Sequence, residues 1–480
     1  MNLAKILFTI GPASARPEII ERLIKEGSRG VRFNFSHGDH STHLKNYRMV
    51  REVSNRLRIP VATVMDLQGP KIRVDDINGA IEIKPEEIIE VGLRQSDSSK
   101  KFIPFSYQEV INSVKEGERI LIDDGKIVLR VINKGKNSFL ARVSVGGLVK
   151  SHKGLNLPET ELKIPALTEK DREDLLFGIR LGFDYVALSF VRSHNDIIEL
   201  REILNRHKSR MRIIAKIERP EALGAIDKIF EVTDMIMVAR GDLGIELPVY
   251  QVPVIQKRLI ARANQVKRPI IVATQMLESM MNALIPSRAE VTDISNAVYD
   301  GADVLMLSGE TASGNYPIET VRMMKRIIIE SESHKSLDSS VGSNTGCTHD
   351  NSSKIHSIAN AVKQITEEQK IRCIITFTQS GRTAEIISKY HIHLPIYAFT
   401  PDKNVLNALA LLRGVIPMLI KYEKNTDHLI DRAIMMLLKE KKISKGDTCI
   451  ITGGMPIPRR GETNFIKVQT VADIPKIDFN

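Results

Sequence analysis

Eight short runs of apolar, largely β-branched residues alternate with amphipathic segments along this sequence. The runs are KILFTI (5–10), GVRFNF (30–35), VATVMD (61–66), DYVALSF (184–190), RIIAKIE (212–218), MIMVARGD (235–242), PIIVATQ (269–275) and DVLMLSGE (303–310). The segments between them, such as PEIIERLIKEG (17–27), have helical spacing. Strands that lack a polar face must be covered on both sides, so we predict an α/β fold with a parallel (β/α)8 barrel of the TIM type. We assign residues 1–69 and 166–340 to it.

The third repeat of this alternation is interrupted. After Asp66 the next helical pattern, EKDREDLLFGIRLG, begins only at residue 169. Between them lie alternating β-like runs with turn signals, including RILIDDGKIVLRVI (119–132), whose Asp-Gly pair suits a hairpin. We therefore predict a small β-barrel domain, residues 70–165, inserted after strand three and hinged at Gly69-Pro70 and near Leu157-Pro158. It would hang over one end of the main barrel.

A Ser-rich polar stretch (331–353) separates the barrel from the rest of the chain. Beyond it we expect a helix (354–368), a strand (371–378) and further alternation of helices and strands. This pattern predicts a C-terminal α/β domain over residues 354–480.

Composition narrows the class of protein. At 480 residues and 53.8 kDa the chain is too long for one compact core. No apolar run approaches the roughly 20 residues of a membrane span, and the N-terminal apolar patch is too short for a secretory signal. We expect a cytoplasmic protein without a membrane partner. The net charge of +11 would suit nucleic acid, but Trp is absent and aromatics are 5%, so we predict no nucleic-acid partner. The three cysteines, at 347, 373 and 449, indicate neither a disulfide framework nor a zinc site.

Polar side chains gather at the C-terminal ends of the predicted barrel strands. They are Arg32, Asn34, Ser36, Asp66, Lys216, Glu218, Arg240, Asp242, Thr274, Ser308 and Glu310. Any one of them has an ordinary explanation as a capping or solvated residue. Together they come from six strands, and this rim is where barrel enzymes build their active sites. The set therefore predicts one site with charges of both signs.

The residue types indicate the chemistry of that site. Glu218 and Asp242 offer two hard oxygen ligands without nearby His or Cys, which suits Mg²⁺ or Mn²⁺ better than zinc. Arg32, Arg73 and Lys216 are cations of the kind that hold phosphate and offset charge during phosphoryl transfer. No GxxxxGK[ST] loop is present, so a nucleotide would be held differently from a P-loop enzyme. These features predict a metal-dependent enzyme acting on a small phosphorylated, carboxylate-bearing molecule.

Several long motifs resemble those of the pyruvate kinase family, in order and across the whole chain. They are FTIGPAS (8–14), RFNFSHG (32–38), MDLQGPKIR (65–73), KGLNLP (153–158), AKIERPEA (215–222), MVARGDLGIE (237–246), ATQMLESM (273–280) and LMLSGETASGNYP (305–317). The resemblance implies a glycolytic phosphotransferase that moves the phosphoryl group of phosphoenolpyruvate to ADP, giving pyruvate and ATP. It also implies a homotetramer.

The resemblance implies roles for the rim residues. Arg32 would contact the transferring phosphate, and Lys216 would stabilise its developing charge. Glu218 and Asp242 would hold the divalent ion, with the backbone of Gly241 and Asp242 beside the substrate carboxylate.

Other residues would complete the reaction. Thr274 would lie by the substrate, in the group around enolate protonation, although the atom that delivers the proton stays open. Arg73, Lys153 and His37 would meet the nucleotide phosphates, with Lys153 supplied by the inserted domain. Closure of that domain would exclude water from the transferring phosphoryl group.

Many family members bind K⁺ through the positions that match Asn34, Ser36, Asp66 and the carbonyl of Leu67. K⁺-dependent members resemble DTKGPEIRT here, whereas this chain has Leu67, Gln68, Lys71 and Val74 at the four differing positions. These changes resemble the K⁺-independent branch. Because an ammonium is similar to K⁺ in size and charge and donates to the same oxygens, we expect Lys71 to replace K⁺, which would not be required. The alternative is that Lys71 points to solvent while K⁺ still binds.

The motif TQSGRT (378–383) lies between a predicted strand and helix, where backbone N–H groups favour an anion. In the family this loop resembles one that grips an effector phosphate, which implies effector roles for Thr378, Ser380, Gly381, Arg382 and Thr383. A second loop, residues 453–464 with Arg459 and Arg460, would face the same pocket. An ordinary turn before a capped helix is the alternative. The sequence does not distinguish fructose 1,6-bisphosphate, another sugar phosphate and AMP as the effector.

Two other functions fit parts of the pattern. One is a lyase that handles phosphoenolpyruvate or pyruvate on the same barrel without a nucleotide, but Arg73 and Lys153 would then have no ADP to hold. The other is a non-catalytic sensor that binds phosphometabolites through the C-terminal domain. The intact set of Lys216, Glu218, Asp242 and Thr274 argues against it.

Overall fold

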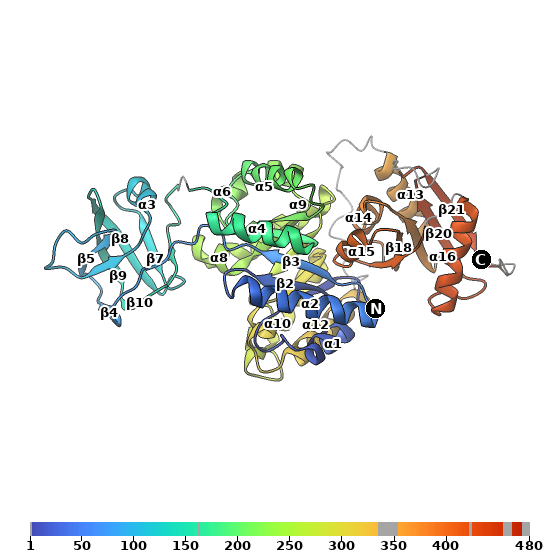
Figure 1. Ribbon diagram of the computed structural model, residues 1–480, viewed down its shortest axis with the longest axis horizontal. Helices are drawn as coiled ribbons and strands as arrows, with labels where there is room; N and C mark the ends of the chain where they lie inside the picture. Colours follow the sequence, from blue (N-terminus) through green and yellow to red (C-terminus); the bar gives the residue numbers. More distant parts are fainter. Residues whose placement is uncertain (1, 162–163, 335–353, 422–424, 455–462, 473–480) are drawn as a thin grey trace.

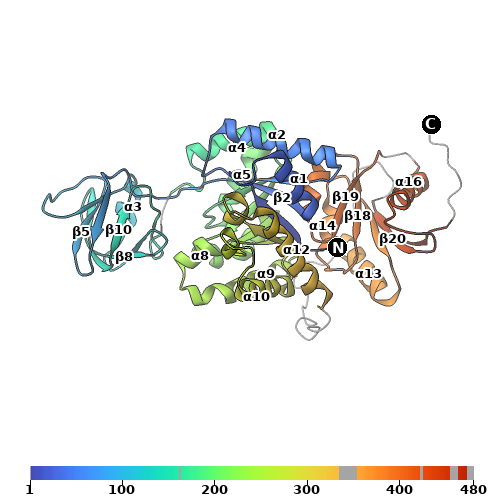
Figure 2. The ribbon, with the colours of Figure 1, turned by 90° about the horizontal axis from the view of Figure 1, so that it is seen from below.

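A central barrel lies between two smaller units in the computed structural model of the chain (Figure 1). The structure describes residues 2–161, 164–334, 354–421, 425–454 and 463–472. The β-rich unit lies on one side of the barrel and the C-terminal α/β unit on the other, and a view from below keeps this order (Figure 2). The two outer units therefore face opposite ends of the barrel.

Eight parallel strands close the barrel. Around the ring they pair in the order β1-β16-β15-β14-β13-β12-β3-β2, and β2 pairs with β1 to close it, with Val31 opposite Phe8. The bounds are β1 (Lys5–Thr9), β2 (Ser28–Asn34), β3 (Ala62–Asp66), β12 (Tyr185–Leu188), β13 (Arg212–Ile217), β14 (Met235–Ala239), β15 (Ile270–Ala273) and β16 (Val304–Leu307). Each matches one of the eight apolar runs, so the predicted fold class is confirmed.

Helices surround this ring. They are α1 (Pro17–Glu26), α2 (His40–Leu57), α4 (Glu169–Leu181), α5 (His194–Arg206), α6 (Pro220–Gly224), α7 (Ile226–Val232), α8 (Arg240–Glu246), η1 (Val249–Gln251), α9 (Val252–Gln265), η2 (Glu278–Met281), α10 (Arg288–Asp300), α11 (Gly309–Ala312) and α12 (Pro317–Ser333). Local sequence sets their ends: Thr168 and Asp171 form a capping box at α4, which stops at Gly182 with φ 77°. None of the helices in the described residues has the length and apolar character that a membrane crossing requires.

The inserted unit between β3 and α4 is built from two sheets around one apolar core. Its elements are β4 (Ala80–Ile83), β5 (Ile88–Gly92), β6 (Phe102–Pro104), α3 (Gln108–Ser113), β7 (Arg119–Ile122), β8 (Ile127–Lys134), β9 (Ser138–Val145), β10 (Gly147–Lys150) and β11 (Leu155–Asn156). Strands β7 and β8 pair from Ile122 opposite Ile127, which places the Asp-Gly turn at Gly125 with φ 83°. We call this unit the lid.

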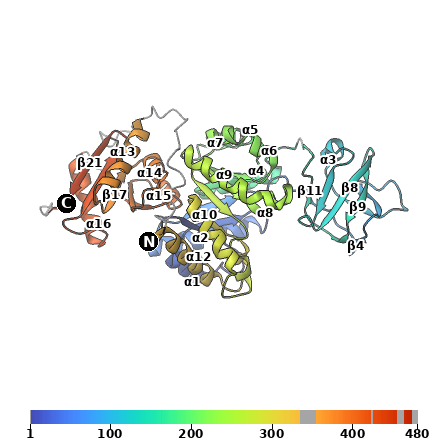
Figure 3. The same ribbon diagram turned by 180° about the vertical axis from the view of Figure 1, so that it is seen from behind.

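The C-terminal unit is a five-stranded sheet of order β19-β18-β17-β20-β21, with β21 antiparallel (Figure 3). Its elements are α13 (Lys354–Glu368), β17 (Cys373–Phe377), α14 (Arg382–Ser388), β18 (Ile396–Thr400), α15 (Lys403–Leu409), β19 (Val415–Leu419), α16 (Thr426–Lys439), β20 (Thr448–Gly453) and β21 (Phe465–Thr470). Of the Ser-rich stretch 331–353, helix α12 includes residues up to Ser333, and residues 335–353 lie outside the described residues, as do Arg459 and Arg460.

The C-terminal unit covers the N-terminal end of the barrel. Residues inside the barrel, such as Leu7 and Tyr185, belong to the same apolar cluster as Ile374 and Leu411 of the C-terminal unit. The Tyr185 hydroxyl donates to the Ala408 carbonyl at 2.8 Å. Two buried ion pairs cross the boundary, Lys389 Nζ to Asp303 Oδ2 at 2.6 Å and Arg413 to Glu332 at 3.0 Å. This end is closed, which leaves the C-terminal rim for a site.

Lys5 is a buried cation at this boundary, and its replacement should stabilise the protein. Its ammonium donates to the Val415 carbonyl at 2.8 Å, and burial, with Arg29 and Arg413 nearby, lowers the pKa of Lys5 to about 7. The folded state therefore binds fewer protons than the unfolded state between pH 7 and 10.5, and the charged lysine costs the most stability below pH 7.

We expect Lys5→Met to raise the free energy of unfolding by on the order of 3 kcal/mol at pH 6. The gain should shrink as the pH rises from 7 toward 10.5, because the wild-type lysine then loses its proton in the folded state. Thermal unfolding midpoints of both proteins at pH 6 and pH 9 measure it. An unchanged or lower midpoint at pH 6 would show that Lys5 carries no penalty.

Candidate active site

Three strand ends meet at the buried carboxylate of Asp66. Asp66 is the last residue of β3, and its Oδ2 accepts a hydrogen bond from Arg32 Nε of β2 at 2.6 Å. Its Oδ1 lies 3.2 Å from Lys216 Nζ of β13. The Arg32 guanidinium also donates to the Thr9 hydroxyl at 3.2 Å. The structure thus brings together Arg32, Asp66 and Lys216, which are separated widely in the sequence.

Ser189 holds Lys216 in place, and the sequence analysis missed it. Its hydroxyl donates to the Leu67 carbonyl at 2.7 Å and accepts from Lys216 Nζ at 2.8 Å. The available signal was its position, directly after the apolar strand β12. Gly69 lets the chain pass close by: its φ is 69°, and a Cβ there would lie 2.9 Å from the Phe190 ring. Gly69, which the sequence predicts as a hinge residue, therefore packs directly against Ser189 and Phe190.

The charges at this centre stabilise one another. Burial alone would lower the pKa of Lys216, but the carboxylates of Asp66 and Glu218 raise it well above its usual range. Burial would likewise raise the pKa of Asp66, and Lys216 and Arg32 together lower it. Lys216 is therefore a fixed cation, as charge stabilisation of an anionic reaction centre requires.

Glu218 is the residue best prepared to hold a metal. It follows β13 and is fully buried, and its Oε2 accepts from the Phe190 N–H at 2.8 Å. Its Oε1 lies 2.9 Å from Lys216 Nζ but accepts no hydrogen bond. Burial and the nearby charge of Asp242 raise the pKa of Glu218, as expected for two carboxylates that share a place for a cation.

Asp242 lies in the first turn of α8, and its carboxylate makes no hydrogen bond or ion pair with the described part of the chain. No cluster of three or more His, Cys, Asp or Glu side chains suited to a metal occurs among the described residues. Two neighbouring carboxylates fit Mg²⁺ or Mn²⁺, because Mg²⁺ usually takes one or two protein carboxylates and completes its shell with substrate oxygens and water.

Thr274 and Gly241 face each other across neighbouring strand ends. The Thr274 hydroxyl accepts from the Gly241 N–H at 2.9 Å and donates to the Ala273 carbonyl at 2.6 Å. Thr274 has φ 68°, which is rare for a β-branched residue. Arg240 supports this conformation, since its guanidinium donates to the Thr274 carbonyl at 2.6 Å and pairs with Asp293 at 2.5 Å. Arg240 is thus a positioning residue for Thr274.

The predicted cation cage is only partly assembled. The Asn34 side-chain oxygen accepts from the Ser36 N–H at 3.2 Å, and the Leu67 carbonyl is bonded to Ser189. Lys71 lies elsewhere: it lines a small cavity at the lid hinge with Phe190 and Arg219, and its side chain packs beside Gly154. Within the described residues its ammonium has no hydrogen bond or ion pair with Asn34, Ser36 or Asp66.

The predicted nucleotide residues are held apart from Lys216. Arg73 donates to the His152 carbonyl at 2.9 Å, and Lys153 pairs with Asp123 at 2.7 Å, both within the lid. His37 is exposed at the barrel rim. The lid lies to one side of the barrel in Figure 1.

The lid is nevertheless anchored at its base. The Asn156 amide of β11 donates to Glu246 Oε1 at 2.9 Å, and Arg219 holds Glu246 Oε2 at 3.0 Å. Both Arg219 and Glu246 belong to the barrel side, so this bridge fixes the point about which the lid would turn.

The strand-end residue Glu310 has a structural role. Glu310 is fully buried and accepts from the Ser308 N–H at 2.7 Å and the Leu277 N–H at 3.1 Å. These bonds fasten two loops of the rim, so Glu310 is not available to a ligand.

The loop 378–383 forms a tight turn in the C-terminal unit. The Thr378 hydroxyl accepts from the Gly381 N–H at 2.9 Å, Gly381 has φ 90°, and α14 starts at Arg382. Arg382 pairs with Glu385 at 2.7 Å, and the hydroxyls of Thr383 and Thr463 lie 2.7 Å apart. One side of this loop therefore contacts Thr463, which precedes β21.

Comparison with known proteins decides the family. A family model described as pyruvate kinase, barrel domain, matches residues 1–321, and one described as pyruvate kinase, alpha/beta domain, matches residues 356–469. The chain belongs to the pyruvate kinase family. The expectation of a phosphotransferase enzyme is thereby confirmed.

Curated relatives named pyruvate kinase are similar over nearly the whole chain. The protein of Clostridium acetobutylicum is 40% identical over 482 residues, covering 98% of this chain and all of the relative. Those of Sporosarcina psychrophila and Staphylococcus haemolyticus are each 38% identical, covering 99% and 98% of this chain and 81% of the relative.

Proposed function

We propose that this member of the pyruvate kinase family transfers the phosphoryl group of phosphoenolpyruvate to ADP, giving pyruvate and ATP, with Mg²⁺ or Mn²⁺ as cofactor. The observation that carries the proposal is the position of Lys216, a buried cation held between Asp66 and Glu218 beside the guanidinium of Arg32. The experiment is to incubate the protein with phosphoenolpyruvate, ADP and Mg²⁺ and to quantify the products. Equimolar pyruvate and ATP are expected.

The cations act on the transferring group. Arg32 and Lys216 present two positive charges at the C-terminal rim of the barrel. There they would bind the phosphate and offset the negative charge that develops during transfer. Asp66 holds both in place through its two oxygens. Because this arrangement is formed before substrate binds, little reorganisation would be needed during the reaction.

Glu218 and Asp242 would hold the divalent ion. When bound, that ion supplies Lewis-acid stabilisation of substrate oxygens. The carboxylate of Glu218, whose Oε1 also pairs with Lys216, and the carboxylate of Asp242, which is unpaired among the described residues, are the ligands that this chain would contribute. The Gly241 N–H and the Thr274 hydroxyl lie together beside them, which suits a substrate carboxylate and the group around enolate protonation.

The lid would complete the site. Arg73 and Lys153 lie on the lid, and with His37 of the rim they would hold the nucleotide phosphates once the lid turns about its base at Asn156 and Glu246. Closure would place the nucleotide opposite Lys216 and exclude water, which protects the phosphoryl group from hydrolysis.

Several further properties belong to the same proposal. Loop 378–383, with Thr378, Ser380, Gly381, Arg382 and Thr383, would bind a phosphorylated allosteric effector. The enzyme would be a cytoplasmic homotetramer that works without K⁺. The charge of Lys71 supports independence from K⁺, provided that lid closure carries the ammonium from its place beside Gly154 to the oxygens of Asn34, Ser36 and Asp66.

We expect Lys71→Glu to create a requirement for K⁺. Without K⁺ the variant should lose at least about tenfold in turnover, because the missing cation is worth more than 1.4 kcal/mol near a phosphoryl group. Added K⁺ should restore much of the loss, and Na⁺ should restore less. Turnover of wild type and variant in buffers with K⁺, Na⁺ or tetramethylammonium tests this. If wild type already fails without K⁺, or the variant behaves like wild type in all three buffers, Lys71 does not replace the cation.

A further inference from the structure

A cavity of about 490 Å³ lies between the N-terminal rim of the barrel and the C-terminal unit. On the barrel side it is lined by the connection from α5 to β13, and on the other side by Gln379, Ser380 and the start of α15. This is the end of β13 opposite to Lys216, so the cavity is separate from the candidate active site. Its volume is in the range of pockets that bind small molecules.

One wall of the cavity is cationic. The sequence HKSRMR places His207, Lys208, Arg210 and Arg212 along it. Among the described residues that line the cavity, Asp184 is the only one with a carboxylate, and this carboxylate is already paired with Arg51. Its Oδ2 accepts from Arg51 at 2.7 Å and from the Thr63 N–H at 2.7 Å. The wall therefore presents an excess of positive charge.

Two of these cations are available to a ligand. Within the described part of the chain, the Lys208 ammonium makes no hydrogen bond or ion pair. Arg210 pairs with Asp402, but its side chain is 59% exposed, and a surface pair of this kind contributes little. Both side chains can therefore turn toward an anion without loss of a strong contact.

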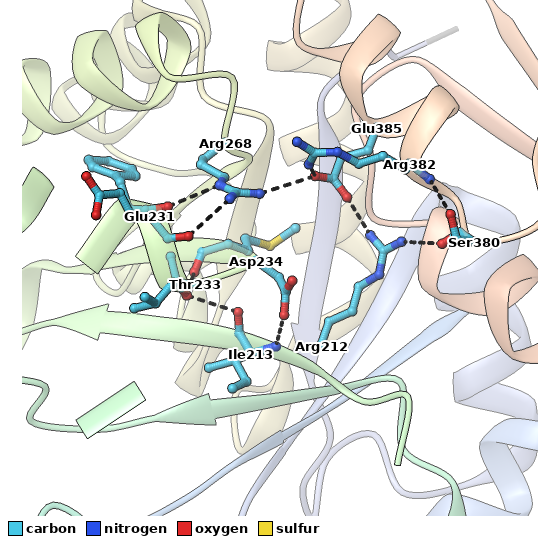
Figure 4. Close-up of polar contacts among 12 residues, drawn as sticks. Arg212, Ile213, Glu231, Thr233, Asp234, Arg268, Ser380, Arg382 and Glu385 are labelled. Carbon is cyan, nitrogen blue, oxygen red and sulfur yellow. Dashed lines mark hydrogen bonds and ion pairs between the residues drawn. The ribbon is translucent and has the colours of Figure 1, made fainter. Parts of the chain in front are cut away.

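Arg212 forms the fixed part of the wall. Figure 4 shows its guanidinium between β13 and the C-terminal unit, where it donates to Glu385 at 3.0 Å and to the Ser380 carbonyl at 3.1 Å. A Cβ on Gly381 would lie 2.6 Å from this guanidinium, so the loop 378–383 closes directly over Arg212. Arg268 and Arg382 also approach Glu385, at 3.9 and 2.7 Å, which leaves one buried carboxylate among three cations.

Apolar side chains also line the cavity. Phe183 does so on the barrel side and Val405 and Ala408 of α15 on the other, and Gln379 and Asn404 add side-chain amides. A bare inorganic anion would leave most of the 490 Å³ unfilled. The arrangement therefore fits a molecule with an anionic head and an organic body.

We propose that this cavity is a second ligand site, which binds a small phosphorylated metabolite. The phosphate lies against Lys208, which has no partner among the described residues, and against Arg210, which would leave its exposed pair with Asp402. A phosphate dianion complements two cations better than a single carboxylate does. The carbon skeleton lies against Phe183 and Val405. The site does not depend on the proposed reaction. It shares Ser380 with the predicted effector loop 378–383 but not Thr383, which lies on the side of that loop that meets Thr463.

The test uses glycerol 3-phosphate, inorganic phosphate and glycerol as probes of the full-length protein. Each is titrated while the thermal midpoint is followed, since a ligand of the folded state raises it. The variant Lys208→Ala/Arg210→Ala removes the two cations that would face the phosphate. Its matched control, Arg206→Ala/Lys403→Ala, removes two exposed cations at the end of α5 and the start of α15, and neither side chain lines the cavity. Because all four side chains are exposed, both variants should fold.

We expect glycerol 3-phosphate to raise the midpoint of wild type and of the control variant with the same half-saturation. In Lys208→Ala/Arg210→Ala the half-saturating concentration should rise at least about tenfold. Glycerol should have no effect, and inorganic phosphate should bind more weakly than glycerol 3-phosphate. Equal weakening in both double variants would show a general charge effect and overturn the proposal. So would loss of the response in Thr383→Val, which would place the ligand in the predicted effector pocket, or equal affinity for phosphate and glycerol 3-phosphate.

Discussion

Replacement of Lys216 by Met should lower turnover by roughly 10³-fold. Lys216 is 8% exposed, and its ammonium contacts Asp66, Glu218 and Ser189. Without it, two buried carboxylates face the transferring phosphoryl group with only Arg32 to offset them, so the penalty falls mainly on the transition state. The KM for phosphoenolpyruvate should change much less than kcat, and steady-state kinetics with both substrates separates the two.

The matched control is Lys5→Met, which removes another buried lysine from a strand of the same barrel, at its opposite end. It should leave kcat unchanged while raising the thermal midpoint. Loss of folding in Lys216→Met would confuse the comparison, so Lys216→Arg serves as a second variant that keeps the charge. If Lys216→Met retained wild-type kcat, the buried cation would have no part in the chemistry.

Glu218→Gln should weaken binding of the divalent ion and lower turnover by about 10² to 10³-fold. Glutamine keeps the shape of the side chain, but its neutral amide is a poor ligand for a hard cation, and it leaves Lys216 with Asp66 alone. Binding of Mn²⁺, followed by electron paramagnetic resonance in the absence of substrate, gives a readout that does not depend on turnover. High Mn²⁺ should recover part of the lost activity.

Glu246→Gln is the comparison for this variant, because Glu246 is also a buried glutamate but pairs with Arg219 at the lid base. It should bind Mn²⁺ with wild-type affinity. Equal Mn²⁺ affinity in wild type and Glu218→Gln would remove Glu218 from the metal site and leave Asp242 without its partner.

The barrel and the strand-end residues were predictable because they depend on local patterns. Each of the eight apolar runs became a barrel strand, and the C-terminal ends of parallel strands must share one rim. Arg32, Asp66 and Lys216 therefore meet, as periodicity and position indicated.

Other features depend on contacts between distant segments, which no local pattern carries. Ser189 is an unremarkable serine in the sequence, and only the closure of β12 against β13 brings its hydroxyl to Lys216. Cys373 and Cys449 are far apart in the chain, yet parallel pairing of β17 and β20 brings their sulfur atoms to 3.4 Å. The place of Lys71 depends on how the lid is oriented, which the residues near it do not determine.

The central claim is that this site transfers a phosphoryl group to a nucleotide, and omission of ADP tests it most directly. Pyruvate is measured after incubation with phosphoenolpyruvate and Mg²⁺, with and without ADP. The account predicts pyruvate only when ADP is present, accompanied by an equal amount of ATP. Pyruvate release without ADP would indicate a nucleotide-independent lyase or hydrolase. No pyruvate with or without ADP would indicate a protein that binds phosphometabolites without turning them over. Either result would contradict the account.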